Sequence, residues 1–332
     1  MNEPQATGLL GPASLDALLA GLIDYAGLFP PAALDMQAAV ANYAGYLGGP
    51  YARALGRFIL PVNRFPEFER AFASVNPVEP WGISALIGPS FEADLIAVDQ
   101  FNKRHSQKAF VDTIEVKAGT SYQISHIRAF VRGTITPYFE IPTSDPAELL
   151  QTIHHIRGRA KIRTGGLTPD AFPSSESVAN FIAVCAKHDV AFKATAGLHH
   201  PLRCSKPLTY ETDAPVGTMH GFINVFLAAT AAWASAKTVR GDTQYAQRSS
   251  TVDSPPLVFS FQCDPQYIVK QLQTISPFEF YDDHVQFYDD HVHSPMQLPT
   301  SVIVDCRHNF AISFGSCSFE EPIADLNTLN LL

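Results

Sequence analysis

Short apolar runs alternate with amphipathic segments over residues 57–236 of the chain. Each apolar run ends near a glycine, proline or serine, and the segment that follows places apolar residues three or four positions apart, as one face of a helix does. Strands that alternate with helices of this kind pair in parallel through right-handed crossovers. The pattern predicts six strands, at residues 57–62, 81–88, 110–118, 136–142, 160–164 and 190–196.

The same pattern extends toward both ends of the chain and brings the number of strands to eight. An earlier strand is predicted at 23–29, after a helix over about 15–22, and a last strand at 310–315, before a helix near 320–329. Further helices are predicted at 91–105, 146–157, 174–188 and near 219–236, with Ser174 as an N-cap.

Eight strand–helix units predict an α/β fold, a (β/α)8 or TIM barrel that forms one domain over residues 1–332. The structural alternative is an open, doubly wound sheet. The sequence weakens it, because no GxGxxG motif follows the first strands.

Residues 237–305 do not follow the repeat, and we expect an irregular insertion there that covers the barrel mouth. The insertion contains a helix-like segment at 264–276 and a tandem copy, FYDDHVQ followed by FYDDHVH, at 280–293. Its aspartates and histidines suggest a metal site, but adjacent aspartates on an extended chain point to opposite faces. The favoured interpretation is a surface hairpin or loop that arose by local duplication.

Composition narrows the class of protein. The chain has 332 residues, of which 46% are hydrophobic and 17% charged, enough for one large core. Its net charge of −9 and its lack of lysine or arginine runs argue against nucleic-acid partners. No basic segment precedes the first apolar residues, and the longest apolar stretch, at 222–234, contains Asn224 and Thr230. We therefore expect neither a signal peptide nor a membrane span.

Five cysteines without a CxxC pair fit a reducing compartment, so the expected location is the cytoplasm. Apolar residues in 255–280 could serve an interface in a homo-oligomer.

The strongest chemical signal lies at the ends of the sixth and seventh strands, since TIM barrels carry their chemistry at the carboxyl ends of strands. These ends read KIRTG at 161–165 and FKATAG at 192–197. Side chains alternate along a strand, so Lys161, Arg163 and Lys193 are predicted to point inward, with the two lysines about 5 Å apart at the backbone. Like charge and poor solvation both lower the pKa of an amine, and a neutral lysine can form a Schiff base with a carbonyl. The alternative is that each lysine pairs with a carboxylate, Glu115 or Glu140.

Those two glutamates lie near the ends of the fourth and fifth strands. Glu115 shares a strand face with Lys117, and Glu140 sits among apolar residues, where a buried carboxylate needs a cation or a proton. Either glutamate is a candidate general acid or base, or the counter-charge of the lysines.

The last strand ends in FGSCSFEEP at 314–322. Gly315, Ser316 and Ser318 offer backbone N–H groups and hydroxyls at the start of a helix, a candidate seat for an anion. The alternative is ordinary N-capping by Ser318.

Taken together, KIRTG, FKATAG and FGSCS at 314–318 resemble three strand ends of the class I deoxyribose-phosphate aldolases, in the same order and on the corresponding strands. The resemblance covers about twenty residues. It implies that Lys161 forms the Schiff base, that Lys193 tunes it and that the FGSCS turn binds a phosphate. As a whole, the chain also resembles an uncharacterised bacterial family with the segments AGLHHP and FGSCSFEEP.

Three histidines keep a second chemistry open. His199 and His200 follow the seventh strand, and His220 precedes the next helix. Together with Glu115 and Glu140 they are a candidate ligand set for Zn²⁺, Mn²⁺ or Fe²⁺ in a metal-dependent lyase, isomerase or hydrolase. A histidine of this loop could instead move protons in an aldol reaction, or bind a substrate carboxylate with Arg203.

The sequence therefore predicts a carbon–carbon lyase or aldolase that acts on a small anionic carbonyl substrate through a lysine Schiff base. A barrel that binds a small molecule without converting it is a further alternative. The aldolase interpretation requires no cofactor, whereas its rival requires a divalent metal. The predicted catalytic residues are Lys161, Lys193, Glu115, Glu140 and His199, and the predicted substrate-binding residues are Arg163, Lys117, His200, Arg203, Gly197, Gly315, Ser316 and Ser318.

Overall fold

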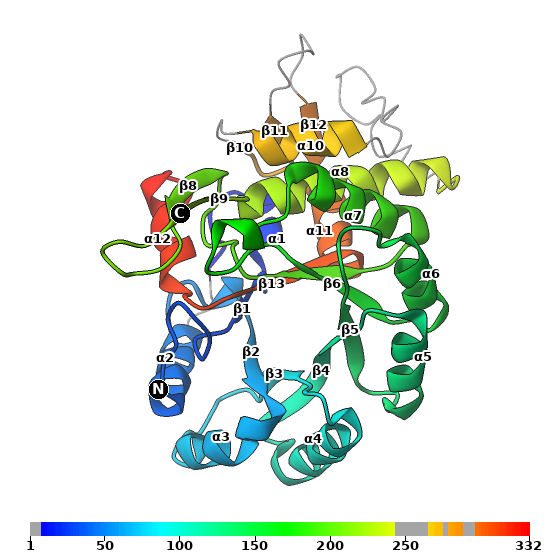
Figure 1. Ribbon diagram of the computed structural model, residues 1–332. Helices are drawn as coiled ribbons and strands as arrows, with labels where there is room; N and C mark the ends of the chain where they lie inside the picture. Colours follow the sequence, from blue (N-terminus) through cyan, green and yellow to red (C-terminus); the bar gives the residue numbers. More distant parts are fainter. Residues whose placement is uncertain (1–7, 243–264, 275–277, 288–295) are drawn as a thin grey trace.

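The structure, a computed structural model, describes residues 8–242, 265–274, 278–287 and 296–332. Eight parallel strands close into a barrel in the order β1-β13-β7-β6-β5-β4-β3-β2 (Figure 1). They are β1 (Ile23–Tyr25), β2 (Leu55–Pro61), β3 (Trp81–Leu86), β4 (Ala109–Lys117), β5 (Thr136–Glu140), β6 (Arg159–Arg163), β7 (Phe192–Thr195) and β13 (Ala311–Ser316). The predicted α/β barrel is confirmed, and every predicted strand overlaps an observed one. The largest difference is at β1, which ends at Tyr25 rather than at Phe29.

Helices surround the barrel and join its strands. They are α1 (Ala13–Leu19), α2 (Met36–Leu47), α3 (Phe65–Phe72), α4 (Phe91–His105), α5 (Ser121–Phe130), α6 (Ala147–His155), α7 (Ser175–His188), α8 (Phe222–Val239), α11 (Thr300–Asn309) and α12 (Glu320–Thr328), with short 3-10 helices at Ala52–Ala54, Val62–Arg64 and Pro169–Ala171. The predicted N-cap of α7 is confirmed, because the Ser174 side chain accepts a hydrogen bond from the backbone N–H of Ser177.

The hydrophobic core lies between the barrel wall and these helices. Phe192 of β7 points outward, as predicted, and packs against Phe181 of α7 and Phe310, with ring centroids 5.7 and 5.2 Å apart. Helix α8 is long and apolar enough to cross a membrane by length and composition, but 83% of its most apolar window is buried inside the protein. Its all-round apolar surface is that of a core helix.

The predicted irregular insertion is partly regular. Helix α10 (Pro265–Gln273) confirms the helix-like segment and packs against α7 and α8. Strands β10 (Glu279–Phe280), β11 (His284–Phe287) and β12 (Met296–Pro299) form a small antiparallel sheet. The expectation of irregular structure up to residue 305 is wrong, because α11 begins at Thr300 and packs against β13.

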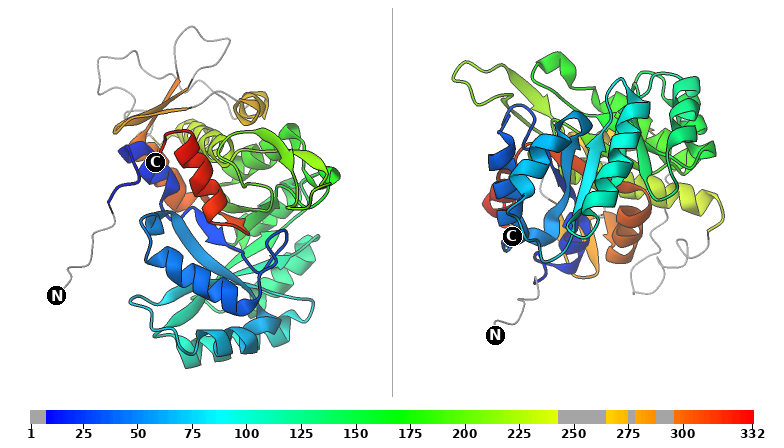
Figure 2. Two further views of the ribbon diagram at one scale, coloured as in Figure 1. Left: turned by 90° about the vertical axis from the view of Figure 1, so that its left-hand side faces the viewer. Right: turned by 90° about the horizontal axis from the view of Figure 1, so that it is seen from below.

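The first copy of the duplicated segment forms the turn between β10 and β11, where the backbone N–H of Tyr281 donates to the carbonyl of His284. This agrees with the expected surface hairpin. The second copy lies outside the described residues beyond Phe287. Figure 2 shows the small sheet at the end of the molecule where α1 lies, and Ser14 of α1 donates its backbone N–H to the carbonyl of Tyr281.

The expected cover over the barrel mouth is therefore wrong for the described part of 237–305, none of which lines the mouth cavity. The mouth cavity is instead lined in part by a hairpin that was not predicted from the sequence. It consists of β8 (Cys204–Pro207) and β9 (Val216–Met219), and its Leu208 and Met219 line the mouth.

Candidate active site

A cavity of about 360 Å³ opens at the carboxyl ends of the barrel strands. Its walls are mainly apolar, and the ionisable side chains Glu115, Lys161, Arg163, His199 and Cys317 reach it. Apolar side chains in its wall include Phe29, Ile59, Leu86, Leu167, Phe172, Leu208 and Met219. A mostly apolar hollow with few polar groups is typical of a small-molecule site, and in TIM barrels such sites lie at this end.

The two predicted lysines lie where strand alternation placed them. Lys161 and Lys193 are direct partners in the register of β6 and β7, and both side chains are buried inside the barrel. Lys161 lines the cavity, whereas Lys193, with 1% of its surface exposed, is enclosed within the barrel.

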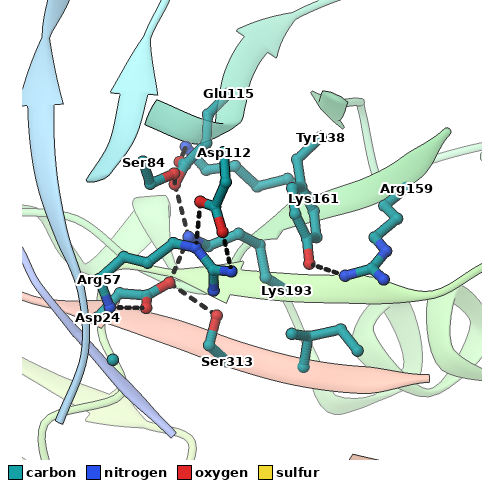
Figure 3. A network of polar contacts seen from close by, with 12 residues as sticks. Asp24, Arg57, Ser84, Asp112, Glu115, Tyr138, Arg159, Lys161, Lys193 and Ser313 are labelled. Atoms are coloured by element: carbon teal, nitrogen blue, oxygen red, sulfur yellow. Dashed lines mark hydrogen bonds and ion pairs between the residues drawn. The ribbon is translucent and has the colours of Figure 1, made fainter. Parts of the chain in front are cut away.

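The two ammonium groups share one carboxylate (Figure 3). The Nζ of Lys161 forms an ion pair with Oε2 of Glu115 at 2.6 Å, and the Nζ of Lys193 forms one with Oε1 at 2.5 Å. Ser84 also donates its hydroxyl to Oε1, at 2.6 Å. Burial opposes ionisation of Glu115, but the two cations outweigh it and hold the pKa of this carboxyl far below its usual range.

Each lysine also has a carboxylate of its own. The Nζ of Lys193 lies 2.6 Å from Oδ2 of Asp24 on β1, and Asp24 accepts further hydrogen bonds from the hydroxyl of Ser313 and the backbone N–H of Arg57, both at 2.7 Å. Burial alone would lower the pKa of Lys193, but Asp24 and Glu115 raise it above its usual range.

At the cavity, the Nζ of Lys161 lies 2.8 Å from Oε2 of Glu140, whose other oxygen binds Nε of Arg163 at 3.0 Å. Burial raises the pKa of Glu140, but Lys161 and Arg163 more than reverse this and lower it. The side chains thus form a chain of alternating charge, Arg163–Glu140–Lys161–Glu115–Lys193–Asp24, in which three cations balance three anions.

This row of alternating charges corrects the predicted state of the two lysines. The sequence suggested two lysines that repel each other and lose protons, with Lys193 lowering the pKa of its neighbour. Instead Glu115 lies between the two ammonium groups and the pKa of Lys193 is raised. The alternative, in which each lysine pairs with Glu115 or Glu140, describes the arrangement found.

Several polar residues inside the barrel, below the lysines, were not predicted from the sequence. The ring of Tyr138 lies between two cations, with its centroid 5.6 Å from both Nζ of Lys193 and the guanidinium carbon of Arg159. Arg57 binds Asp112 through two hydrogen bonds of 2.7 Å. One signal could have revealed Asp24: it is a charged residue within an apolar strand, and such a residue needs a buried partner.

The glycines of the two strand ends bring their loops into contact. A Cβ added to Gly165 would lie 2.7 Å from the Cα of Gly197, and Gly197 has a φ of +76°. The hydroxyl of Thr164 donates to the carbonyl of Ala196 at 2.6 Å and ties the loops together. Gly197 and Phe172 then form part of the cavity wall.

The three histidines do not converge. His199 lines the cavity, and its Nδ1 lies 3.1 Å from Oε2 of Glu321, which lowers the pKa of Glu321. His200 lies outside the mouth cavity, with Nδ1 2.5 Å from Oδ2 of Asp325, and burial lowers its pKa. His220 is buried, and its Nε2 lies 2.8 Å from the carbonyl of Pro173.

The alternative metal set, His199, His200, His220, Glu115 and Glu140, is therefore not assembled, because each histidine faces a different partner while the two glutamates both contact Lys161. Among the described residues, no group of three or more histidine, cysteine or acidic side chains is arranged to hold a metal ion.

The predicted substrate ligands lie in several places. Arg163, Gly197 and Gly315 line the mouth cavity, and 47% of the Arg163 side chain is exposed. Arg203 and His200 do not line it. The Arg203 guanidinium donates to the hydroxyl of Ser175 at 3.1 Å. Lys117 is exposed and lines a neighbouring hollow that also includes Glu140 and Arg163.

The predicted anion seat lies at the start of α12. The hydroxyl of Ser318 accepts from the backbone N–H of Glu321, which is the capping alternative, and Ser316 is buried within β13. The first turn of α12 carries Glu320 and Glu321, whose charges oppose a bound anion. Cys317 lines the cavity, and burial raises the pKa of its thiol to about 11, so it is not an activated nucleophile.

Comparisons of the chain with protein-family models, with curated proteins and with solved structures found no match. The resemblance to class I deoxyribose-phosphate aldolases therefore rests on the three strand ends, and the structure adds an eight-stranded parallel barrel with alternating helices.

Proposed function

We propose that the mouth cavity is the active site of a carbon–carbon lyase of the aldolase type, in which Lys161 forms a Schiff base with a small carbonyl substrate. The observation that carries the proposal is the position of Lys161. It is the lysine that lines the cavity, and its Nζ contacts two carboxylates that can exchange protons with it.

The two carboxylates suit different tasks. An ammonium must lose a proton before it attacks a carbonyl, and Glu140, 2.8 Å away, is the better acceptor. Its pKa is low because Lys161 is charged, so proton transfer to it neutralises both groups and removes the effect that kept the proton away. Glu115 is held by Lys193 and Ser84, stays ionised and stabilises the positive charge of the iminium.

The reaction then follows from the iminium. The neutral amine of Lys161 adds to the carbonyl carbon, a C–N bond forms, and the resulting carbinolamine loses water with a proton returned by Glu140. The iminium draws the electron pair of the bond between the α and β carbons, which breaks to leave an enamine on Lys161. His199, whose Nδ1 is held by Glu321, takes the proton from the hydroxyl of the fragment that departs as an aldehyde.

The cavity walls indicate the substrate class. A volume of about 360 Å³ with mainly apolar walls admits a small molecule, and Arg163 is the cation at the rim. We assign to it an anionic group of the substrate, carboxylate or phosphate, because a guanidinium binds both well. Free thiols at Cys185, Cys204, Cys306 and Cys317 support a reducing, cytoplasmic location.

Borohydride trapping tests the proposal. The full chain is incubated with each of a panel of aldehydes and 2-oxo acids, reduced and weighed by mass spectrometry. We expect at least one compound to add a single adduct. Lys161→Arg keeps the cation but cannot form a Schiff base, so its adduct should disappear, whereas Lys187→Gln on the exposed surface of α7 should behave like the unmodified chain.

Equal trapping of the Lys161→Arg variant, or no adduct with any compound, contradicts the proposal. The second result combined with calorimetric binding of a compound in the panel would favour a barrel that binds a small molecule without converting it. The complete ion pairing of both lysines is the observation that keeps this second function open.

A further inference from the structure

Another hollow lies at the opposite end of the barrel from the mouth cavity. It has a volume of about 520 Å³ and lies where α6 leads into β6, where α7 leads into β7 and where α8 and α11 end. Neither the aldolase proposal nor the strand-end motifs account for it.

Three cations line this hollow: Arg157, Arg159 and Lys237. The side chain of Arg157 is exposed and makes no hydrogen bond or ion pair with the part of the chain that the structure describes. Arg159 uses Nη1 to donate to the hydroxyl of Tyr138 at 2.8 Å, and its other nitrogens have no such partner among the described residues. Two guanidinium groups thus retain most of their donors.

The acidic residues nearby do not neutralise these arginines. Asp189 lines the hollow, but its two oxygens bind Lys237 at 3.1 Å and Arg240 at 3.5 Å. Asp242 is the other acidic side chain in the lining. On a chain with a net charge of −9, an excess of positive charge around one hollow is a local exception that favours anions.

The turn after α6 carries the Arg157 side chain to the hollow. The φ of Arg157 is +54°, the left-handed conformation that commonly ends a helix. The backbone N–H of Arg157 donates to the carbonyl of His154 at 3.0 Å, and that of Gly158 to the carbonyl of Ile153 at 3.0 Å. These bonds close α6, and Arg157 and Gly158 then line the hollow.

We propose that this hollow is a binding site for a small multivalent oxyanion, held mainly by the guanidinium groups of Arg157 and Arg159. Guanidinium groups bind phosphate and carboxylate oxygens through paired, charge-assisted hydrogen bonds. Lys237, which pairs with Asp189 and lies above the ring of Trp233 at 5.4 Å, and the amide of Asn309 complete the polar part of the wall. The site is separate from the mouth cavity and does not depend on the proposed reaction.

Isothermal titration calorimetry of the full chain tests the site, with pyrophosphate and citrate as probes at an ionic strength fixed with sodium chloride. One anion should bind per chain. Arg157→Ala should weaken the binding at least tenfold, because a guanidinium that would bind the anion is removed. The fold should be unaffected, because that guanidinium has no hydrogen-bond or ion-pair partner among the described residues. The pyrophosphate and citrate arms distinguish a phosphate ligand from a carboxylate ligand.

Two arginine variants serve as controls. Arg132→Ala removes an exposed arginine elsewhere and should leave the affinity within twofold. Arg163→Gln removes the cation of the mouth cavity and should also leave it unchanged. The proposal fails if Arg157→Ala binds as tightly as the unmodified chain, if Arg163→Gln abolishes binding, or if neither probe binds above the chloride background.

Discussion

Lys161 and Lys193 are register partners on adjacent strands, yet their ammonium groups bind different oxygens of the same carboxylate, that of Glu115. This bridge converts a repulsive pair of buried cations into part of a balanced chain of charges. Lys161 thus reaches the cavity as a member of this balanced chain of charges, with Oε2 of Glu140 2.8 Å from its Nζ.

Removal of the bridging charge should destabilise the barrel. In Glu115→Gln the two ammonium groups lose their shared anion inside the protein, and breaking a buried ion pair costs about 3–5 kcal/mol. Urea unfolding should show this loss, while Glu79→Gln on the exposed surface should change the free energy of unfolding by less than about 0.5 kcal/mol. Equal stability of the two variants would contradict the arrangement.

The charge cluster also predicts a pH dependence of stability. Glu115 and Glu140 have lowered pKa values in the folded state, so their contribution is complete above the unfolded value of about 4.3 and is lost as the pH falls through the folded values. Lys193 has a raised pKa, so its contribution is complete below about 10.4 and is lost as the pH rises through the folded value.

The free energy of unfolding should therefore show no loss from these groups between about pH 5 and pH 10. Between about pH 4 and pH 2 the unmodified chain should lose more stability than Glu115→Gln, which lacks one of the groups that must be protonated. Parallel curves for the two proteins over this acid range would show that Glu115 does not carry the effect.

Contact between the two glycine loops sets a steric limit. A methyl group at Gly165 would lie 2.7 Å from the Cα of Gly197 and 2.5 Å from the ring of Phe172, so Gly165→Ala should destabilise the protein by about 1–3 kcal/mol. Gly45→Ala is the matched control, because nothing lies within 4 Å of its Cβ position in α2 and alanine favours a helix by about 0.5–1 kcal/mol. Thermal unfolding should shift in opposite directions for the two variants.

The rim cation predicts a difference between substrates. In Arg163→Gln, trapping of a 2-oxo acid by borohydride should slow about tenfold or more, because a charge-assisted hydrogen bond to the carboxylate is lost. Trapping of a neutral aldehyde of similar size should change less than threefold. If both compounds slow equally, Arg163 acts on Lys161 through Glu140 rather than on the substrate.

The sequence predicted the barrel and the inward lysines because both depend on local alternation. Residues two apart on a strand share a face whatever the rest of the chain does, so Lys161 and Lys193 could be placed without knowing their neighbours. Their partners could not. Asp24 lies 169 residues from Lys193 in the chain, and closure of the barrel alone brings them together.

Other elements escaped prediction because tertiary contacts form them. Strand β8 is Cys-Ser-Lys-Pro, with no apolar alternation, and pairs with β9 across a loop. Helix α11 contains several β-branched residues, which favour strands, but Arg307 anchors it by binding the carbonyls of Leu18 and Ala20. Such contacts leave no periodic signal in the sequence.

Peptide mapping of the reduced adduct tests most directly which amine reacts. After trapping with the most reactive compound of the panel, proteolysis and tandem mass spectrometry should place the adduct on Lys161 and leave Lys193 unmodified, since Lys193 is enclosed within the barrel. An adduct on Lys193, or adducts spread only over exposed lysines, would contradict the account.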